Sequence, residues 1–189
     1  MAIQSVPLAK FYRLMNHGPV TLVSAKHNGV ENAMSVAWAC ALDFDKVSIV
    51  VASTAYTRGL IEKSGYFAVQ IPTVRQAELV LDMGESRHEN PDKMRDVGRF
   101  YQDGFDVPLI KDCAAWIICQ LITEPHNQQT YDLLIGKVLG AWADDRIFSH
   151  GHWLFDTAPD ELRTLHYVAG GQFYAIGKGI KFDRGPDMD

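Results

Sequence analysis

Residues 19–42 read PVTLVSAKHNGVENAMSVAWACAL, and this stretch decides the fold that the sequence predicts. Its two ends, 19–26 and 31–42, are rich in β-branched and small residues and have the length of strands. The segment between them, HNGV at 27–30, contains Asn-Gly, which is the strongest short signal for a β-hairpin. The stretch therefore predicts two antiparallel strands joined by a tight turn.

The rest of the chain continues as short strands separated by turn residues, a pattern typical of an antiparallel sandwich or barrel. Residues 86–108 mix charges, Asn-Pro and glycines, and are predicted to form a partly helical connection. Helices are expected at 57–65, where Gly65 ends the helix, and at 74–84. Further strands are expected at 46–53, 66–72, 113–125, 130–144 and 163–177.

The length of 189 residues fits one domain, and we predict a single domain over residues 1–189. The end of the chain, about 183–189, is acidic and carries nothing to bury, so a flexible tail is expected there.

The formal net charge is −5, so the chain lacks the basic footprint that proteins use to follow a phosphate backbone. Nucleic acid is therefore not expected as a main partner. No basic leader followed by an apolar run is visible at the start, and no stretch reaches the length of a membrane span. We accordingly expect a cytoplasmic protein with no membrane partner.

The cysteines and the pair His150 and His152 give no metal or disulfide pattern. Three cysteines, Cys40, Cys113 and Cys119, lie in apolar stretches, which favours buried reduced thiols. The two histidines have no third ligand type nearby, so no metal site is predicted.

The strand expected at 31–42 has one large and one small face. Period-two alternation places Asn32, Met34, Val36, Trp38 and Cys40 on the large face, and Trp38 is interpreted as a core residue. The other face carries Ser35 among alanines. Such a bare face either packs against a helix or leaves room for a planar ring system.

The start of the helix expected at 57–65 is rich in groups that bind anions. Ser53, Thr54 and Thr57 bring hydroxyls, Arg58 brings a guanidinium, and a helix N-terminus presents unpaired N–H groups. The alternative is an ordinary N-cap by Thr57. Because Leu60 stands where a capping box would need Glu or Gln, the N–H groups are expected to stay free for a phosphate.

Residues 18–40 and 47–72 together strongly resemble the flavin reductase-like FMN-binding split-barrel family, especially its flavoredoxin-like branch. The likeness continues more weakly through PDKMRDVG, through IGKV at 135–138 and through LHYVAGGQFYAIG at 165–177. It implies a mainly β fold: an antiparallel Greek-key split β-barrel with a few short flanking helices.

The resemblance also implies a set of FMN-binding residues. Gln70 alternates with Phe67, Val69 and Ile71, so its amide is expected to point away from the core, where it either meets the flavin ring edge or faces solvent. His166 either lies near the open face of the flavin or is structural, and no catalytic residue is assigned. The expected flavin contacts are Asn32, Met34, Ser35 and Gln70, and the expected phosphate contacts are Ser53, Thr54, Thr57 and Arg58.

The family's members imply a homodimer with FMN at the subunit interface and an NAD(P)H-dependent flavin reductase that passes electrons to flavin or another acceptor. The alternative is a flavoredoxin-like electron carrier that holds FMN tightly and reacts little with NADH or NADPH. A pyridoxamine-phosphate-oxidase-like enzyme would need a basic substrate cluster, which the sequence lacks.

Overall fold

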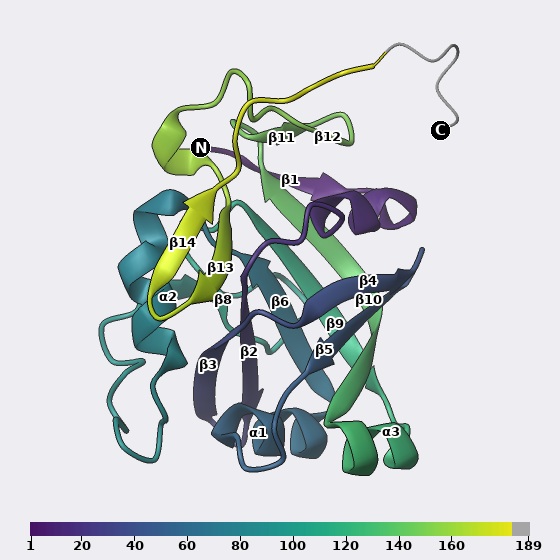
Figure 1. The fold of residues 1–189 in the computed structure, drawn as a ribbon. Coiled ribbons are helices and arrows are strands. Elements are labelled where there is room, and N and C mark those ends of the chain that lie inside the picture. The colour runs from purple at the N-terminus through teal and green to yellow at the C-terminus, as the bar shows by residue number, and fades with distance from the viewer. Residues whose placement is uncertain (183–189) are drawn as a thin grey trace.

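The computed structural model describes residues 1–182, and an antiparallel sheet of eight strands organises the chain (Figure 1). The expected tail at 183–189 lies outside the described residues. Along the sheet the strands are β3 (Val30–Val36), β2 (Thr21–His27), β6 (Tyr66–Ile71), β9 (Ala115–Ile122), β10 (Leu133–Asp144), β5 (Lys46–Val50) and β4 (Ala39–Asp43), and β1 (Ile3–Val6) pairs with β10.

The two ends of this strand order, β3 and β4, follow one another in the sequence with only residues 37–38 between them. The carbonyl of Trp38 in this link accepts a hydrogen bond of 3.0 Å from the Val50 N–H. A sheet whose edges are joined by two residues must curl on itself, as barrels do. The predicted mainly β, antiparallel fold with few short helices is confirmed.

The hairpin predicted from Asn-Gly is also confirmed. Asn28 and Gly29 connect β2 to β3, and both adopt positive φ, 49° and 78°. Two successive residues in this conformation match the twist of paired strands, which is why this dipeptide is favoured there.

Three α-helices cover parts of the sheet: α1 (Tyr56–Ser64), α2 (Ala77–Gly84) and α3 (Pro125–Tyr131). α1 and α3 lie at one end of the sheet, and α2 lies beside β3 (Figure 1). Gly65 ends α1 with φ of 76°, as predicted. Short 3₁₀ segments are η1 (Leu8–Leu14), η2 (Val74–Gln76) and η3 (Asp160–Leu162).

Side chains on the two sheet faces form two hydrophobic clusters. The inner cluster contains Phe67 and Ile117, which lie inside the curled sheet. The outer cluster contains Trp116 and Leu22 and is covered by α2 and by the connection at 86–110. Alternation along β6 and β9 therefore buries both of their faces.

The prediction of one strand over 31–42 was wrong. The chain leaves β3 after Val36 and starts β4 at Ala39, on the far edge of the sheet. Trp38 lies in the break and is 73% exposed, so its interpretation as a core residue was also wrong. Period-two alternation assigns faces only while the backbone stays extended, and the break at 37–38 ends that relation.

Other strands also differ from their predicted bounds, and β5 and β9 are shorter than the strands predicted at 46–53 and 113–125. Pro125 opens α3, which occupies the first residues of the strand predicted at 130–144. The strand predicted at 163–177 is a hairpin of β13 (Leu165–Ala169) and β14 (Gln172–Ala175). Gly170 and Gly171 form its turn with φ of 59° and 79°, conformations that glycine adopts without strain.

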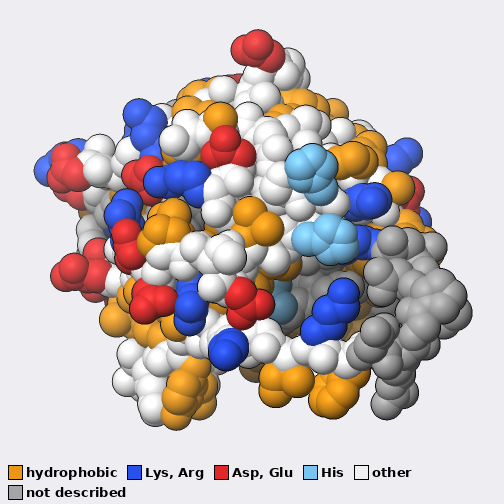
Figure 2. All heavy atoms as spheres, turned by 90° about the horizontal axis from the view of Figure 1, so that it is seen from above, with side chains coloured by type: hydrophobic (Ala, Val, Ile, Leu, Met, Phe, Trp, Pro, Cys, Tyr) orange, Lys and Arg blue, Asp and Glu red, His pale blue; other side chains and the backbone are white. Residues whose placement is uncertain are grey.

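The remaining elements are two small pairs, β7 (Arg99–Phe100) with β8 (Leu109–Ile110), and β11 (Phe148–Ser149) with β12 (His152–Trp153). Figure 2 views the end of the molecule that carries β11 and β12, where acidic, basic and apolar side chains are interspersed. Over residues 1–182, no helix has the length and apolar character needed to cross a membrane.

The cysteines divide into two environments. Cys113 and Cys119 are buried, as predicted, but Cys40 is exposed on β4, so its predicted burial was wrong. β4 is an edge strand, which leaves one side of its backbone and part of its side chains uncovered. Among the described residues, no three His, Cys, Asp or Glu side chains come together in a way that could hold a metal ion.

Candidate functional site

The structure brings β3 to the start of α1. The Asn32 amide donates a hydrogen bond of 2.8 Å to the Thr57 hydroxyl, and both side chains are buried. The N-cap of α1 is Ala55 rather than Thr57, so the alternative of an ordinary N-cap by Thr57 was wrong. Because an alanine has no side-chain acceptor, no side chain caps the N–H groups of the first turn.

Ser53 and Thr54 lie in the turn that leads into α1, where the Ala55 N–H donates to the Ala52 carbonyl at 2.9 Å. Both side chains are exposed. Within residues 1–182 neither hydroxyl is engaged in a hydrogen bond. Free hydroxyls and uncapped helix N–H groups at one place are a donor set suited to an anion.

Arg87 adds a positive charge that the sequence analysis missed. Its guanidinium donates to the Glu31 carbonyl and, at 3.3 Å, to the Asn32 side-chain oxygen. It also lies over the Tyr56 ring, 5.0 Å from the ring centre. Arg87 stands in the long polar connection after α2, far from α1 in sequence, and no local motif marks it. We call Asn32, Ser53, Thr54, Thr57 and Arg87 the α1 N-terminal surface.

Arg58 belongs to a different network. Its side chain is 4% exposed and donates to the carbonyls of Val51 and Gln128 at 2.8 and 2.6 Å. It also forms ion pairs with Asp132 at 2.6 Å and with Glu62 at 2.9 Å. Through these contacts the Arg58 guanidinium connects α1 with α3. The structure therefore does not bring Arg58 to the exposed hydroxyls with which it was grouped.

Gln70 is fully buried, so the expectation that its amide points away from the core was wrong. Its nitrogen donates to the Ser24 hydroxyl at 2.8 Å, and its oxygen accepts from the Ile110 N–H. The face of β6 that was expected to be open is covered by residues 107–110, which belong to the outer cluster. The amide joins β6, β2 and this covering segment.

The small face of β3 is covered by α2. Ala33 is buried, and the Ser35 hydroxyl donates to the Val80 carbonyl of α2. This face was expected either to pack against a helix or to leave room for a planar ring system. Packing against a helix accounts for both Ala33 and Ser35. Met34, on the opposite face beside Asn32, is half-buried.

His166 packs against His17 where the β13–β14 hairpin meets the start of β2. His166 Nδ1 lies 3.0 Å from the Gly18 carbonyl, and His17 Nε2 lies 2.8 Å from the Thr164 hydroxyl. Burial, and then the nearby His166, lowers the pKa of His17 to about 4. A neutral imidazole at position 17 is therefore part of the native packing.

Comparison with known proteins adds to this geometry. The model of the flavin reductase-like domain matches residues 13–170. The crystal structure of an FMN-binding domain of a flavin reductases-like enzyme from Shewanella baltica is 50% identical, with a TM-score of 0.94, over 96% of this chain and 98% of that one. The uncharacterized protein YddH of Escherichia coli is 36% identical over 175 residues, which cover 89% of this chain and 92% of YddH.

A flavoredoxin from Methanosarcina acetivorans is similar in structure, with a TM-score of 0.71 over 88% of both chains. Its sequence is only 19% identical, so this likeness concerns the fold alone. The family match covers every strand of the sheet except β1, together with α1 and the connection that carries Arg87.

Proposed function

This chain belongs to the flavin reductase-like, FMN-binding family, and on that basis we propose that it binds FMN and acts as an NAD(P)H-dependent flavin reductase. Electrons would pass on to flavin or another acceptor. The observation that carries the proposal is the α1 N-terminal surface, where free hydroxyls, uncapped helix N–H groups and the Arg87 guanidinium lie together.

The donor set of this surface fits the phosphate of FMN. Ser53 and Thr54 offer exposed hydroxyls, and the first turn of α1 offers N–H groups with the positive end of the helix dipole. Arg87 supplies the charge, since guanidinium groups bind phosphate through paired N–H donors. Asn32 bonds both Thr57 and Arg87, so it holds two members of the set in place.

FMN, once bound, supplies the electron-transfer chemistry, and the protein supplies binding, orientation and electrostatics. In this proposal the phosphate contacts fix one end of the cofactor, and Met34 and the exposed Trp38 offer apolar surface to its ring system. No side chain is required as an acid or base, and we assign none.

We further propose that a second copy of the chain completes the site. Ligand pockets usually enclose roughly 70–90% of a ligand's surface, whereas Ser53 and Thr54 are exposed and Trp38 is 73% exposed on the single chain. Leu42 and Phe44, on and just after β4, are also exposed, at 51% and 68%. A homodimer that buries this apolar surface would enclose the cofactor. Light scattering after gel filtration should give twice the monomer mass.

The first test is the visible spectrum of the purified protein, with FMN added to any colourless preparation. Binding is expected, and replacement of Ser53 and Thr54 by alanine should weaken it about tenfold or more, because hydrogen bonds to a charged group are worth about 1.5–3 kcal/mol. Thr130→Ala, an exposed hydroxyl on α3, is the control and should bind like the wild type. Failure of the wild type to bind FMN would refute the proposal.

The second test separates a reductase from an electron carrier. NADH or NADPH is added to the FMN-loaded protein without oxygen, and the flavin absorbance is followed. Rapid bleaching with either nucleotide supports the reductase. FMN that stays oxidised with both would reject the reductase and leave the carrier as the function of the same site.

A further inference from the structure

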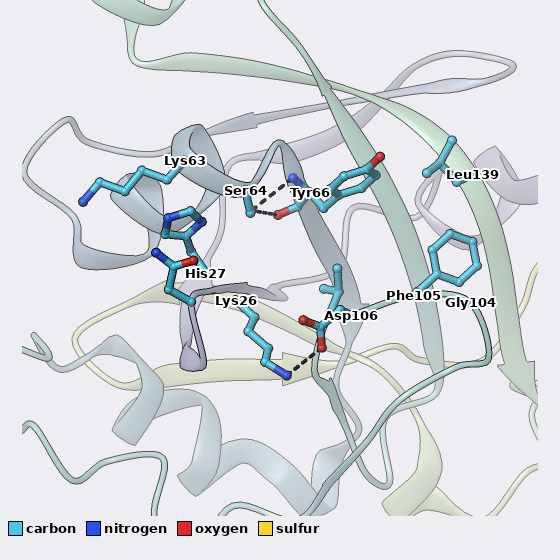
Figure 3. Close-up of a pocket in the computed structure, with 11 residues that line it drawn as sticks. Lys26, His27, Lys63, Ser64, Tyr66, Gly104, Phe105, Asp106 and Leu139 are labelled. Atoms are coloured by element: carbon cyan, nitrogen blue, oxygen red, sulfur yellow. Dashed lines mark hydrogen bonds and ion pairs between the residues drawn. The ribbon is translucent and has the colours of Figure 1, made fainter.

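A cavity of about 310 Å³ lies between α2, the β13–β14 hairpin and the end of β3. Figure 1 shows the hairpin beside α2. The cavity drawn in Figure 3, at the end of α1, has charged walls, and Lys26 pairs there with Asp106 at 2.6 Å. The cavity beside α2 differs, because the described residues that line it are all uncharged: Val20, Ser35, Ala37, Val80, Leu81, Gly84, Tyr167 and Phe173.

Contacts between the surrounding elements hold the walls of this cavity together. The Ser35 hydroxyl donates to the Val80 carbonyl, which joins β3 to α2. The Val20 N–H donates to the Leu165 carbonyl at 2.8 Å, which joins the start of β2 to β13. Phe173 of β14 packs against the outer cluster, to which Val20 and Val80 belong. Sheet, helix and hairpin are therefore fixed relative to one another around the cavity.

The walls differ in the size of their side chains. Ser35, Ala37 and Gly84 bring small groups from the sheet and the helix, whereas the hairpin brings two aromatic rings. The ring centres of Tyr167 and Phe173 are 5.3 Å apart, and the rings are inclined by 56°. Small groups on two sides and aromatic rings on the third leave room for a flat molecule against the rings.

We propose that this cavity binds a small neutral molecule with an aromatic ring. The ring lies against Tyr167 and Phe173 and also contacts Val80 and Leu81, where contacts between rings and the burial of apolar surface stabilise it. A charged group on the ligand would lose water without gaining an ionic partner, because no wall carries a charge. The volume lies at the lower end of small-molecule sites, roughly 300–1,000 Å³, so the ligand is small.

This cavity is separate from the proposed phosphate site. No residue of the α1 N-terminal surface lines it. Ser35 lies on the opposite face of β3 from Asn32 and Met34, because side chains alternate along a strand. The proposal therefore does not rest on FMN binding, and either one can fail without the other.

The probe for this proposal is 4-fluorobenzyl alcohol, followed by fluorine NMR line broadening on titration. We expect saturable binding in the millimolar range or tighter. The anion 4-fluorobenzoate and the cation 4-fluorobenzylammonium should both bind about fivefold more weakly or worse, since each would bury an unpaired charge. Both charges are tested because the net charge of −5 by itself favours a cation. Equal or tighter binding of either charged probe would overturn the proposal.

Two variants and a control locate the bound probe. Leu81→Ala should weaken binding about threefold, because it removes apolar contact area. Ala37→Leu should weaken it as well, because the larger side chain takes up space in the cavity. Leu8→Ala is the matched control, since Leu8 is 43% exposed, against 45% for Leu81, and does not line the cavity. This variant should bind like the wild type.

Three results would contradict the assignment of the probe to this cavity. The first is the absence of saturable binding to the wild type. The second is an equal loss of affinity in Leu81→Ala and Leu8→Ala. The third is displacement of the probe by FMN, because the probe would then occupy the cofactor surface.

Discussion

Acid should destabilise the protein through His17, whose ring is packed among aromatic side chains. Its centre lies 5.0 Å from that of Trp153, 5.3 Å from that of Phe155 and 5.8 Å from that of His166. Its Nδ1 is buried and has no hydrogen-bond partner. A proton on this ring would therefore add a charge that the native packing does not compensate.

The size of the effect follows from the pKa of His17, which burial lowers from 6.5 to about 4 in the folded state. At a pH between these two pKa values, His17 is protonated in the unfolded chain but mostly neutral in the folded chain. The free energy of unfolding therefore falls as the pH falls. Because each pKa unit corresponds to about 1.36 kcal/mol, the full effect is at most about 3.4 kcal/mol. Between pH 7 and pH 4.5 it amounts to about 2.4 kcal/mol.

Urea unfolding at pH 7 and pH 4.5 measures this effect for the wild type and for His17→Gln. The variant should lose about 2.4 kcal/mol less on acidification than the wild type. The contribution of the carboxylates is common to both proteins and cancels in this comparison. His152→Gln, an exposed histidine on β12, is the control and should behave like the wild type. Equal acid losses in the wild type and in His17→Gln would refute the reasoning.

Three further outcomes are expected. Arg58→Lys should lower the free energy of unfolding by about 2–3 kcal/mol, because an ammonium cannot keep the pair with Asp132 together with both backbone contacts. In the native protein Cys113 and Cys119 should not react with a thiol reagent, and both should react in urea, because burial raises the pKa of these two thiols. Gly136→Ala should lower the free energy of unfolding by about 1–3 kcal/mol, measured by chemical denaturation, since its methyl group would clash with the Phe67 ring.

Local signals predicted the parts of the fold that local chemistry determines. The Asn28-Gly29 turn requires two residues that tolerate positive φ, and its sequence is sufficient to show it. The turn at Gly170 and Gly171 also needs two residues that tolerate positive φ. The residues on both sides of it are β-rich, however, so 163–177 was predicted to be one strand. The break at 37–38 could not be predicted, because the β4–β5 hairpin is placed at the far edge of the sheet by the pairing of β5 with β10, which is distant in sequence.

For the candidate site, the sequence pointed to some residues that lie together in the structure, missed one and included others that lie elsewhere. Asn32, Thr57 and the exposed hydroxyls lie together because β3 and α1 pack against each other, and each carries a local signal. Arg87 comes from a connection whose position is set by tertiary contacts, so its sequence shows only a basic residue in a polar stretch. Arg58 shows the opposite case, since it stands beside the hydroxyls in sequence while its side chain bonds to α3.

The side-chain amide of Asn32 links Thr57 to Arg87, because both its nitrogen and its oxygen form hydrogen bonds. The nitrogen donates to Thr57 and the oxygen accepts from Arg87, so the amide orients a hydroxyl and a guanidinium at the start of the same helix. An aspartate would accept from Arg87 but could not donate to Thr57, and a leucine would remove both of these hydrogen bonds and leave Arg87 with the Glu31 carbonyl. The residue type at position 32 therefore follows from the need to fix a donor set on β3, α1 and the connection after α2. In the proposed FMN site, Asn32 would therefore be a positioning residue that orients Thr57 and Arg87 toward the phosphate.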